Sequence, residues 1–192
     1  MGQRSVLAAV GTLEGILPAG LPSWLARVLR LGRVDFSPAH RQPSFGRVLI
    51  ALVVSIAGSL AADALLVRIG TAIWPGTSGY VHFQFHDYAR LTIAGVVIAC
   101  AAWPVVTRLS SAPRWLFFRL AVLVTLVLWV PDLYILDLGQ PARAVAVLMV
   151  MHLAIALVTY NSLVHIARVK PLPDDPAGPP AQDSGRRAGA SA

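Results

Sequence analysis

The sequence predicts an all-α protein in which four transmembrane helices form a bundle, with the N and C termini both cytoplasmic. The first observation behind this fold class is composition: 13% of the 192 residues are charged, whereas soluble domains usually have about 25%. The second is four apolar runs, each near the roughly 20 residues with which a helix crosses a bilayer. The third is that basic residues concentrate in alternate loops. The predicted spans are residues 47–69, 88–107, 115–137 and 143–166.

Residues 1–46 form a basic N-terminal segment that contains one candidate amphipathic helix, over residues 22–31. Pro22 suits the first turn of a helix. Apolar residues from Trp24 onward would lie broadly to one side, with Arg27 and Arg30 on another. This arrangement is typical of helices that lie on an anionic membrane surface. The alternatives are a flexible basic tail and an N-terminal extension from a misassigned start codon.

The first span, residues 47–69, has one face of small and polar residues among leucine, valine and isoleucine. These residues recur at the spacing of one helix face, and small residues allow helices to approach closely in lipid. We therefore expect this face to point into the bundle. Its members are Ser55, Gly58, Ser59, Ala62 and Asp63.

The loop at residues 70–86 alternates polar and apolar residues from Tyr80 to His86, which predicts a short strand or an extended interfacial segment. His82 and His86 share a face in either a strand or a helix, which makes them weak candidates for a metal site. Asp87 is the only nearby third ligand. Ordinary surface histidines are the default interpretation, and no metal is predicted.

The second span, residues 88–107, has Gly95, Ala99 and Trp103 at intervals of four, which predicts a second close-packing face. Pro104 is expected to kink this helix near its inner end. The third and fourth spans are joined by a tight turn at residues 138–142, which predicts an antiparallel hairpin. Residues 168–192 have no apolar pattern and are expected to form a disordered cytoplasmic tail.

The basic residues predict the orientation of the four spans. All but three of the 16 lysines and arginines lie in the N-terminal segment, around the loop between spans two and three, or in the tail. The three exceptions, Arg68, Arg90 and Arg143, lie on the opposite side. Because basic loops stay cytoplasmic, both termini are predicted to be inside.

Three ionisable residues lie within the predicted spans at similar depth. Asp63, Asp132 and His152 belong to the first, third and fourth spans, and each lies roughly 8–14 Å below the outer interface at about 1.5 Å per residue. Pro131 precedes Asp132 and is expected to free a backbone carbonyl one turn back. Residues near the outer ends of the spans are candidate supporting residues for this layer: Arg68, Asp87, Arg90 and Asp137.

Two interpretations of this polar set stay open. Ionisable residues inside a membrane are functional candidates by default, so the set predicts a small polar cavity for a cation, a proton relay or a ligand headgroup. Alternatively, it locks the helices together, with Asp132 or Asp63 paired to Arg68, Arg90 or His152. Contacts of this kind contribute about 0.6–2 kcal/mol each.

The sequence carries no motif of a known catalytic site. A phosphate-binding glycine loop, HExxH and GxSxG are all missing. Cys100 is the single cysteine, which excludes an intramolecular disulfide. The net charge of +7 flanks apolar runs, so we interpret it as membrane orientation, and nucleic acid is not expected as a partner. No catalytic residue and no cofactor is predicted.

Three segments resemble a known group of proteins: Phe-His-Asp-Tyr-Ala-Arg-Leu at 85–91, Trp-Val-Pro-Asp-Leu at 129–133 and Met-Val-Met-His-Leu-Ala-Ile-Ala at 149–156. They are similar to uncharacterised four-helix integral membrane proteins of actinobacteria, in which a Pro-Asp in the third span and a Met-His in the fourth recur. The resemblance covers roughly residues 47–167. It implies a multi-pass protein of the bacterial plasma membrane and no particular reaction.

We carry three functional hypotheses from the sequence. The first is an accessory or structural membrane protein that packs with itself or with a membrane-protein partner. The second is a small transporter or ion- or proton-handling protein that uses the layer of Asp63, Asp132 and His152. An enzyme is the last of the three.

Overall fold

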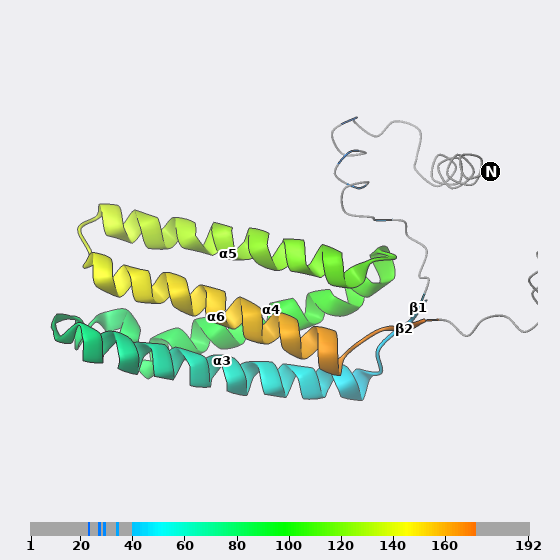
Figure 1. Ribbon diagram of the computed structural model, residues 1–192, viewed down its shortest axis with the longest axis horizontal. Coiled ribbons are helices and arrows are strands. Elements are labelled where there is room, and N and C mark those ends of the chain that lie inside the picture. The colour runs from blue at the N-terminus through cyan, green and yellow to red at the C-terminus, as the bar shows by residue number, and fades with distance from the viewer. Residues whose placement is uncertain (1–22, 24–26, 28, 30–33, 35–39, 172–192) are drawn as a thin grey trace, which may run out of the picture.

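Four long helices run side by side along one axis in the computed structural model (Figure 1). The structure describes residues 40–171 and, before them, residues 23, 27, 29 and 34. Each helix is long and apolar enough to cross a membrane, so the all-α, four-helix class is confirmed. The helices are α3 (Phe45–Ile73), α4 (Phe85–Leu109), α5 (Pro113–Asp137) and α6 (Ala142–Ile166).

Two predicted segments fall largely outside the described residues. These are the amphipathic helix at 22–31 and the tail from 172 onward. The described start of the tail was not predicted: β2 (Lys170–Pro171) pairs antiparallel with β1 (His40–Arg41), directly before α3. Next to this pair, Gln42 and Thr107 form two hydrogen bonds: Gln42 Nε2 donates to the backbone carbonyl of Thr107, and Thr107 Oγ1 donates to Gln42 Oε1.

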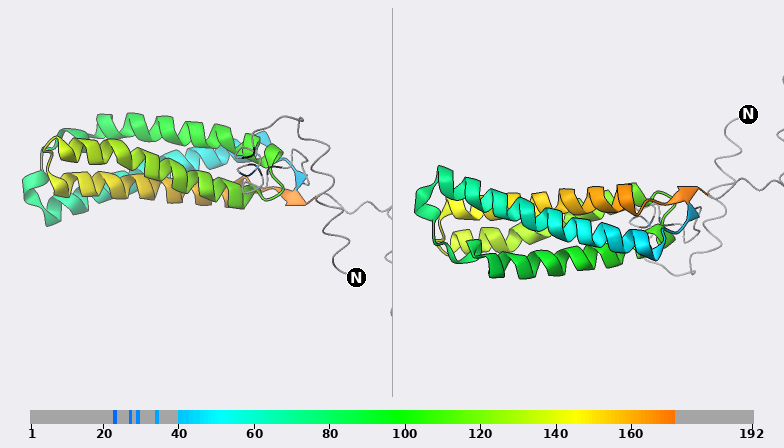
Figure 2. Two further views of the ribbon diagram at one scale, coloured as in Figure 1. Left: turned by 90° about the horizontal axis from the view of Figure 1, so that it is seen from above. Right: turned by 90° about the horizontal axis from the view of Figure 1, so that it is seen from below.

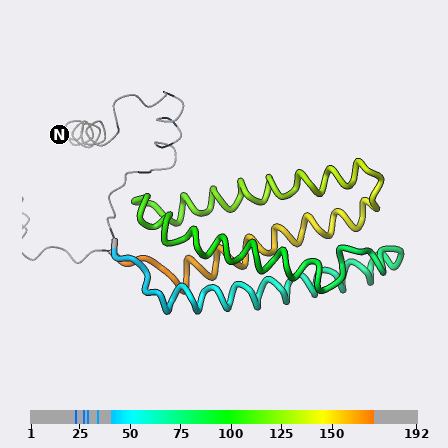
Figure 3. The backbone as a smooth tube through the Cα atoms, turned by 180° about the vertical axis from the view of Figure 1, so that it is seen from behind, coloured from blue at the N-terminus to red at the C-terminus, as the bar shows by residue number. Residues whose placement is uncertain are grey.

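The two ends of the bundle differ, and we name them by their connections. The terminal end carries β1, β2 and the short α4–α5 connection at 110–112. The loop end carries residues 74–84 and the α5–α6 turn at 138–141. Figure 3 follows the chain between these ends, with both flanks of the bundle leaving at the terminal end.

The α3–α4 connection at the loop end is helical, so the predicted strand or extended segment is wrong. It forms two single 3-10 turns, η1 (Pro75–Thr77) and η2 (Val81–Phe83). Phe83 is buried in the bundle, and Tyr80 lies edge-on to it with ring centroids 5.2 Å apart. The alternation of polar and apolar residues therefore comes from a turn that anchors its aromatic residues.

Helix α6 is the centre of the bundle, because it packs against each of the other three helices (Figure 2). Its interface with α3 is the most extensive of the described part of the chain. Two glycines bring these helices close together. A Cβ atom on Gly58 would lie 2.9 Å from Val158 Cγ1, and one on Gly70 would lie 2.8 Å from Val147 Cγ2. The predicted small-residue face of α3 therefore points into the bundle.

The predicted packing face of α4 is wrong at one position. Gly95 is exposed, and a Cβ atom there would meet no described atom within 4 Å. The buried face instead follows Thr92, Val96, Cys100 and Trp103. Gly95 directly precedes Val96 of this face, so the rotation of α4 about its own axis decides which of the two residues is buried. Contacts with the neighbouring helices set this rotation. The helix continues through Pro104.

Apolar clusters fill both ends of the bundle. At the terminal end, the Trp103 ring lies edge-on to Phe117 at 5.1 Å, and Phe117 stacks on Tyr160 at 6.2 Å. We call these three residues the aromatic cluster. At the loop end, Phe83 and Met151 belong to a second buried cluster with Tyr88 and Val147.

Removing the indole N–H of Trp103 should destabilise the terminal end. Trp103 is fully buried, and its Nε1 donates a 2.8 Å hydrogen bond to the buried carbonyl of Ala167. A buried acceptor that loses its donor costs about 1–3 kcal/mol. We expect Trp103→Phe to lower the unfolding free energy by this amount in a detergent unfolding titration.

The matched control is Trp129→Phe. Trp129 is half-buried, and its Nε1 donates a longer bond, 3.0 Å, to the Met149 carbonyl. We expect a smaller loss there because the hydrogen bond is longer and the Trp129 ring is only partly buried. Equal losses of unfolding free energy in the two variants would contradict our inference that the hydrogen bond from Trp103 to Ala167 stabilises the terminal end.

Candidate functional site

The candidate site is a polar layer to which each helix contributes one residue: Asp63, Thr92, Asp132 and His152. On α3, Asp63 is completely buried. On α4, Thr92 faces it and donates a 2.7 Å hydrogen bond from Oγ1 to Asp63 Oδ2. Among the described residues, the second oxygen, Asp63 Oδ1, has no hydrogen-bond partner. One carboxylate oxygen is thus held and the other is left available.

Asp132 and His152 form the other half of the polar layer. Asp132 Oδ2 lies 3.0 Å from His152 Nδ1, with Asp132 nearly buried and His152 more open. The separation is that of an ion pair when the imidazole is protonated. The oxygen lies off the ideal N–H direction, so within the described chain neither atom has a well-directed hydrogen bond. The contact is therefore close but not locked.

The helix register places the two halves at one level. Helices α3 and α6 are antiparallel, with Gly58 beside Val158 and Gly70 beside Val147. Interpolation between these contacts puts Asp63 within about two residues of the level of His152, and the two side chains interact electrostatically. The three ionisable residues singled out from the sequence therefore lie in one layer of the bundle.

A column of buried hydroxyl groups continues from the polar layer toward the terminal end. Ser59 and Ser55 lie one and two turns from Asp63 on the same face of α3, and both are completely buried. Thr159 on α6 is also buried, at the level of Gly58. The hydroxyl groups of Ser59 and Thr159 have no hydrogen-bond partner among the described residues, whereas Ser55 lies against the buried thiol of Cys100 on α4. The column extends about 12 Å from Asp63 to Ser55, at 1.5 Å per residue.

Tyr80 lies on the loop side of the polar layer. Its hydroxyl group is buried and, within the described residues, has no hydrogen-bond partner. Its ring also lies edge-on to His82, with centroids 5.3 Å apart. Burial, and then the nearby Asp132 carboxylate, raise the pKa of the Tyr80 phenol, so the group stays protonated at neutral pH.

The predicted supporting residues lie away from the polar layer. Arg68, Arg90 and Asp137 are exposed, and among the described residues none of them forms an ion pair. Asp87 pairs with its neighbour His86 at 3.3 Å instead. The two metal candidates, His82 and His86, are exposed, and the described chain holds no group of three metal-ligating side chains.

Two residues of the site were not singled out from the sequence as part of it. Thr92 carries the direct hydrogen bond to Asp63, and Tyr80 entered the sequence analysis only as the first residue of the alternating segment 80–86. A signal for Thr92 existed, because it shares the helix face of Trp103 through Val96. Tyr80 had no such signal, because its approach to the polar layer depends on the η2 turn.

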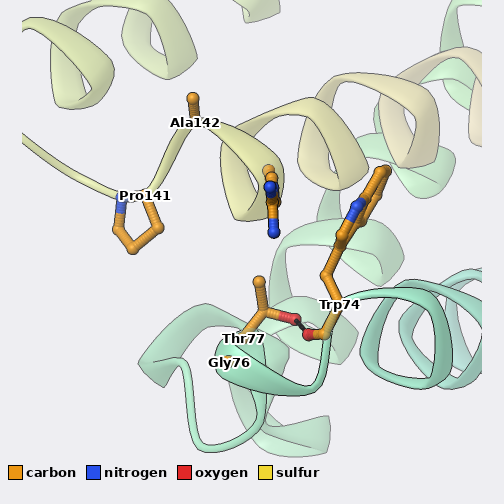
Figure 4. A pocket seen from close by; sticks show the side chains of 6 residues that line it. Trp74, Gly76, Thr77, Pro141 and Ala142 are labelled. Carbon is orange, nitrogen blue, oxygen red and sulfur yellow. Dashed lines mark hydrogen bonds between the residues drawn. The ribbon is translucent and has the colours of Figure 1, made fainter.

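A separate open pocket lies at the loop end, between η1 and the start of α6. Figure 4 shows Trp74 and Thr77 on one wall and Pro141 and Ala142 on the other. Its volume is about 340 Å³, and Arg143 also lines it. Thr77 Oγ1 donates to the Trp74 carbonyl at 2.8 Å, which fixes the turn. The lining includes no residue of the polar layer.

The fold and the site together define a multi-pass membrane protein with an ionisable layer inside its helix bundle. The chain was compared with protein-family models, curated proteins and solved structures, and none of them matches it.

Proposed function

We propose that this chain is a small ion- or proton-handling protein of the bacterial plasma membrane, and that its site is the polar layer. Asp63 carries the proposal. It is a fully buried carboxyl group in a span, and the only side chain that hydrogen-bonds to it in the described chain is the neutral Thr92. A mobile positive ion at this position would balance its charge.

Electrostatics supports this proposal. A carboxylate within a bilayer carries a cost of about 3 kcal/mol even on insertion scales, so such groups are usually paired. Asp132 has His152 beside it. For Asp63, the arginines predicted as partners are exposed and unpaired within the described chain. A proton, or a hard monovalent cation held by oxygen atoms, is the simplest counter-charge.

The buried hydroxyls fit the same proposal. Ser59 and Thr159 offer buried oxygen atoms within about two helical turns of Asp63, and oxygen ligands suit hard cations. Burying a polar group without a hydrogen bond is unfavourable by about 1–3 kcal/mol in proteins. Several such groups in one place are better explained by a bound ion or bound water than by packing alone.

Location and orientation belong to the proposal. The basic residues favour cytoplasmic termini, which would place the polar layer in the outer part of the membrane. The resemblance of residues 47–167 to four-helix membrane proteins of actinobacteria favours the bacterial plasma membrane.

An accessory role is the second candidate, and specific contacts favour it. The Asp132–His152 contact joins α5 to α6, and the Asp63–Thr92 bond joins α3 to α4. Such bonds stabilise membrane bundles by about 0.6–2 kcal/mol each. Helix α5 also exposes a long apolar face that lipid, a second copy or a partner protein would cover. This role leaves the second oxygen of Asp63 unexplained.

Asp63→Asn should remove ion-dependent stabilisation while keeping the fold. An amide has nearly the shape of the carboxyl group and still accepts the bond from Thr92. We expect the wild type to melt at higher temperature as proton or Na⁺ concentration rises, since a ligand at 100 times its Kd stabilises by about 2.7 kcal/mol. The variant should lose this dependence in thermal melts in detergent micelles.

Asp137→Asn is the matched control, because Asp137 is an exposed carboxylate at the loop end of α5. It should respond to both ions as the wild type does. A wild-type protein that is insensitive to both ions would favour the accessory role. Equal ion dependence in Asp63→Asn and the wild type would exclude Asp63 as the site.

A further inference from the structure

We infer that the proton is the ion exchanged at the polar layer, and that it enters from the loop end through His82 and Tyr80. It then passes along Asp132 and His152 to Asp63. This inference rests on the proposed function, because it names the ion, the route and the entry residues of the same site.

The entry point is the exposed imidazole of His82. This side chain lies on the η2 turn, next to the ring of Tyr80, and interacts electrostatically with Asp132. An imidazole can bind and release a proton, and the other exposed histidine at this end, His86, is paired with Asp87 instead. The buried Tyr80 hydroxyl also lies within the field of Asp132. An imidazole that reaches solvent and a buried hydroxyl thus lie on the loop side of the first carboxylate.

The middle of the route is the contact between Asp132 and His152. At 3.0 Å, a proton on Asp132 Oδ2 can move to His152 Nδ1. Imidazole can bind a proton at one nitrogen and release another from the second nitrogen. His152 interacts electrostatically with Asp63 at the same level of the bundle.

Each transfer balances. His82 binds a proton from water, gives it to Asp132 through the Tyr80 hydroxyl, and returns to its neutral form. Asp132 gives a proton to His152, and the imidazole releases one to the Asp63 carboxylate through intervening water or a side-chain rotation. One O–H or N–H bond breaks as another forms, and no electrons are gained or lost.

The surroundings leave few competing routes. The titratable and charged groups that face the layer are Asp63 on α3, Tyr88 on α4, Asp132 on α5, His152 on α6, and Tyr80 and His82 on the connection. Beyond Asp63, the described side chains of the column are hydroxyls, and the aromatic cluster then closes the terminal end. The route is therefore open at one end in this conformation.

The test is the rate at which Asp63 gains a proton after a rapid drop in pH. The full chain is placed in lipid nanodiscs, and the carboxylic-acid infrared band that disappears in Asp63→Asn is followed in time. A positioned proton-transfer group contributes about 100-fold or more to such a rate. We expect His82→Ala to slow the appearance of this band by about that factor, and free imidazole in solution to restore the wild-type rate.

Matched variants separate the route from general damage. His86→Ala removes an exposed histidine that pairs with Asp87, and should keep the wild-type rate. His82→Gln should be as slow as His82→Ala, and Tyr80→Phe should be slow with its ring retained. A wild-type rate in His82→Ala, or equal slowing in His86→Ala, would overturn the route.

The failure of the route can be told apart from the failure of the proposed function. If the Asp63 band appears with pH but its rate ignores His82, only the route is wrong. If no band depends on Asp63 at any pH, the site takes up no proton and the inference fails with it. In that case, Na⁺-dependent melting of the wild type would still support a cation at the site.

Discussion

Replacing Gly58 with leucine should destabilise the bundle more than any exposed substitution of the same kind. A Cβ atom at Gly58 would lie 2.9 Å from Val158 Cγ1, on the most extensive helix interface of the described chain. Valine is stiff about its χ1 angle and cannot turn away freely. Overpacking of a tight core costs about 1–3 kcal/mol, and leucine adds three carbons beyond Cβ, so we expect the upper part of this range.

The measurement is equilibrium unfolding in mixed detergent micelles, with Gly95→Leu as the control. Both glycines lie within long helices, but a Cβ atom at Gly95 would meet no described atom within 4 Å. Gly95→Leu should therefore be neutral or slightly stabilising, because glycine is a poor helix former. If both variants were destabilised equally, the close approach of α3 and α6 would be wrong.

The second large effect is expected at Asp132 and His152. Removing one partner of a buried ion pair typically costs about 3–5 kcal/mol, because the remaining charge stays buried. His152 is partly open, so we expect Asp132→Ala and His152→Ala each to lower the free energy of unfolding by an amount near the lower limit of this range. The paired replacement Asp132→Leu with His152→Leu should cost much less, because it leaves no unpaired ionisable group.

A double-mutant cycle measures this coupling directly. The two alanine variants and their combination are unfolded in the same micelles, with Asp137→Ala as an exposed carboxylate control. Strongly non-additive losses are expected for the pair. Losses that simply add would mean that the 3.0 Å contact contributes nothing to the joining of α5 and α6.

The sequence was sufficient for the spans because a bilayer imposes its own length scale. Runs of about 20 apolar residues with few charges leave little room for another fold. The same length scale predicted that Asp63, Asp132 and His152 lie at similar depth. The inward face of α3 was also predictable, because Ser55, Ser59 and Asp63 contrast with the apolar residues around them.

Other features depend on how the helices rotate and meet. Gly95 was predicted inside and lies outside, because a rotation set by neighbouring helices separates it from Val96. The bond from Thr92 to Asp63 joins residues 29 positions apart, and no local pattern encodes it. The 3-10 turns at 75–83 arise where Phe83 finds a buried place, and the β1–β2 pair depends on both flanks meeting at the terminal end.

The structure also refines the composition of the site. The sequence grouped three spans by depth and added exposed residues such as Arg68 and Asp137 as support. In the bundle the support comes instead from the neutral hydroxyl of Thr92, and the hydroxyls of Tyr80, Ser59 and Thr159 are buried nearby without a partner among the described residues. A layer of this chemistry can change its charge by binding one ion. A layer of fixed arginine–carboxylate pairs would not.

The most direct test of the central claim is a proton-binding titration of the purified protein in unbuffered solution, compared with Asp63→Asn. The titration covers the pH range in which both proteins stay folded, with and without Na⁺. The account predicts that, without Na⁺, the wild type binds an additional proton that Asp63→Asn does not bind. If Na⁺ occupies the same site, the wild type releases this proton when Na⁺ is added. If the titration curves of the wild type and Asp63→Asn superimpose, and Na⁺ changes neither of them, an ion-binding polar layer is contradicted.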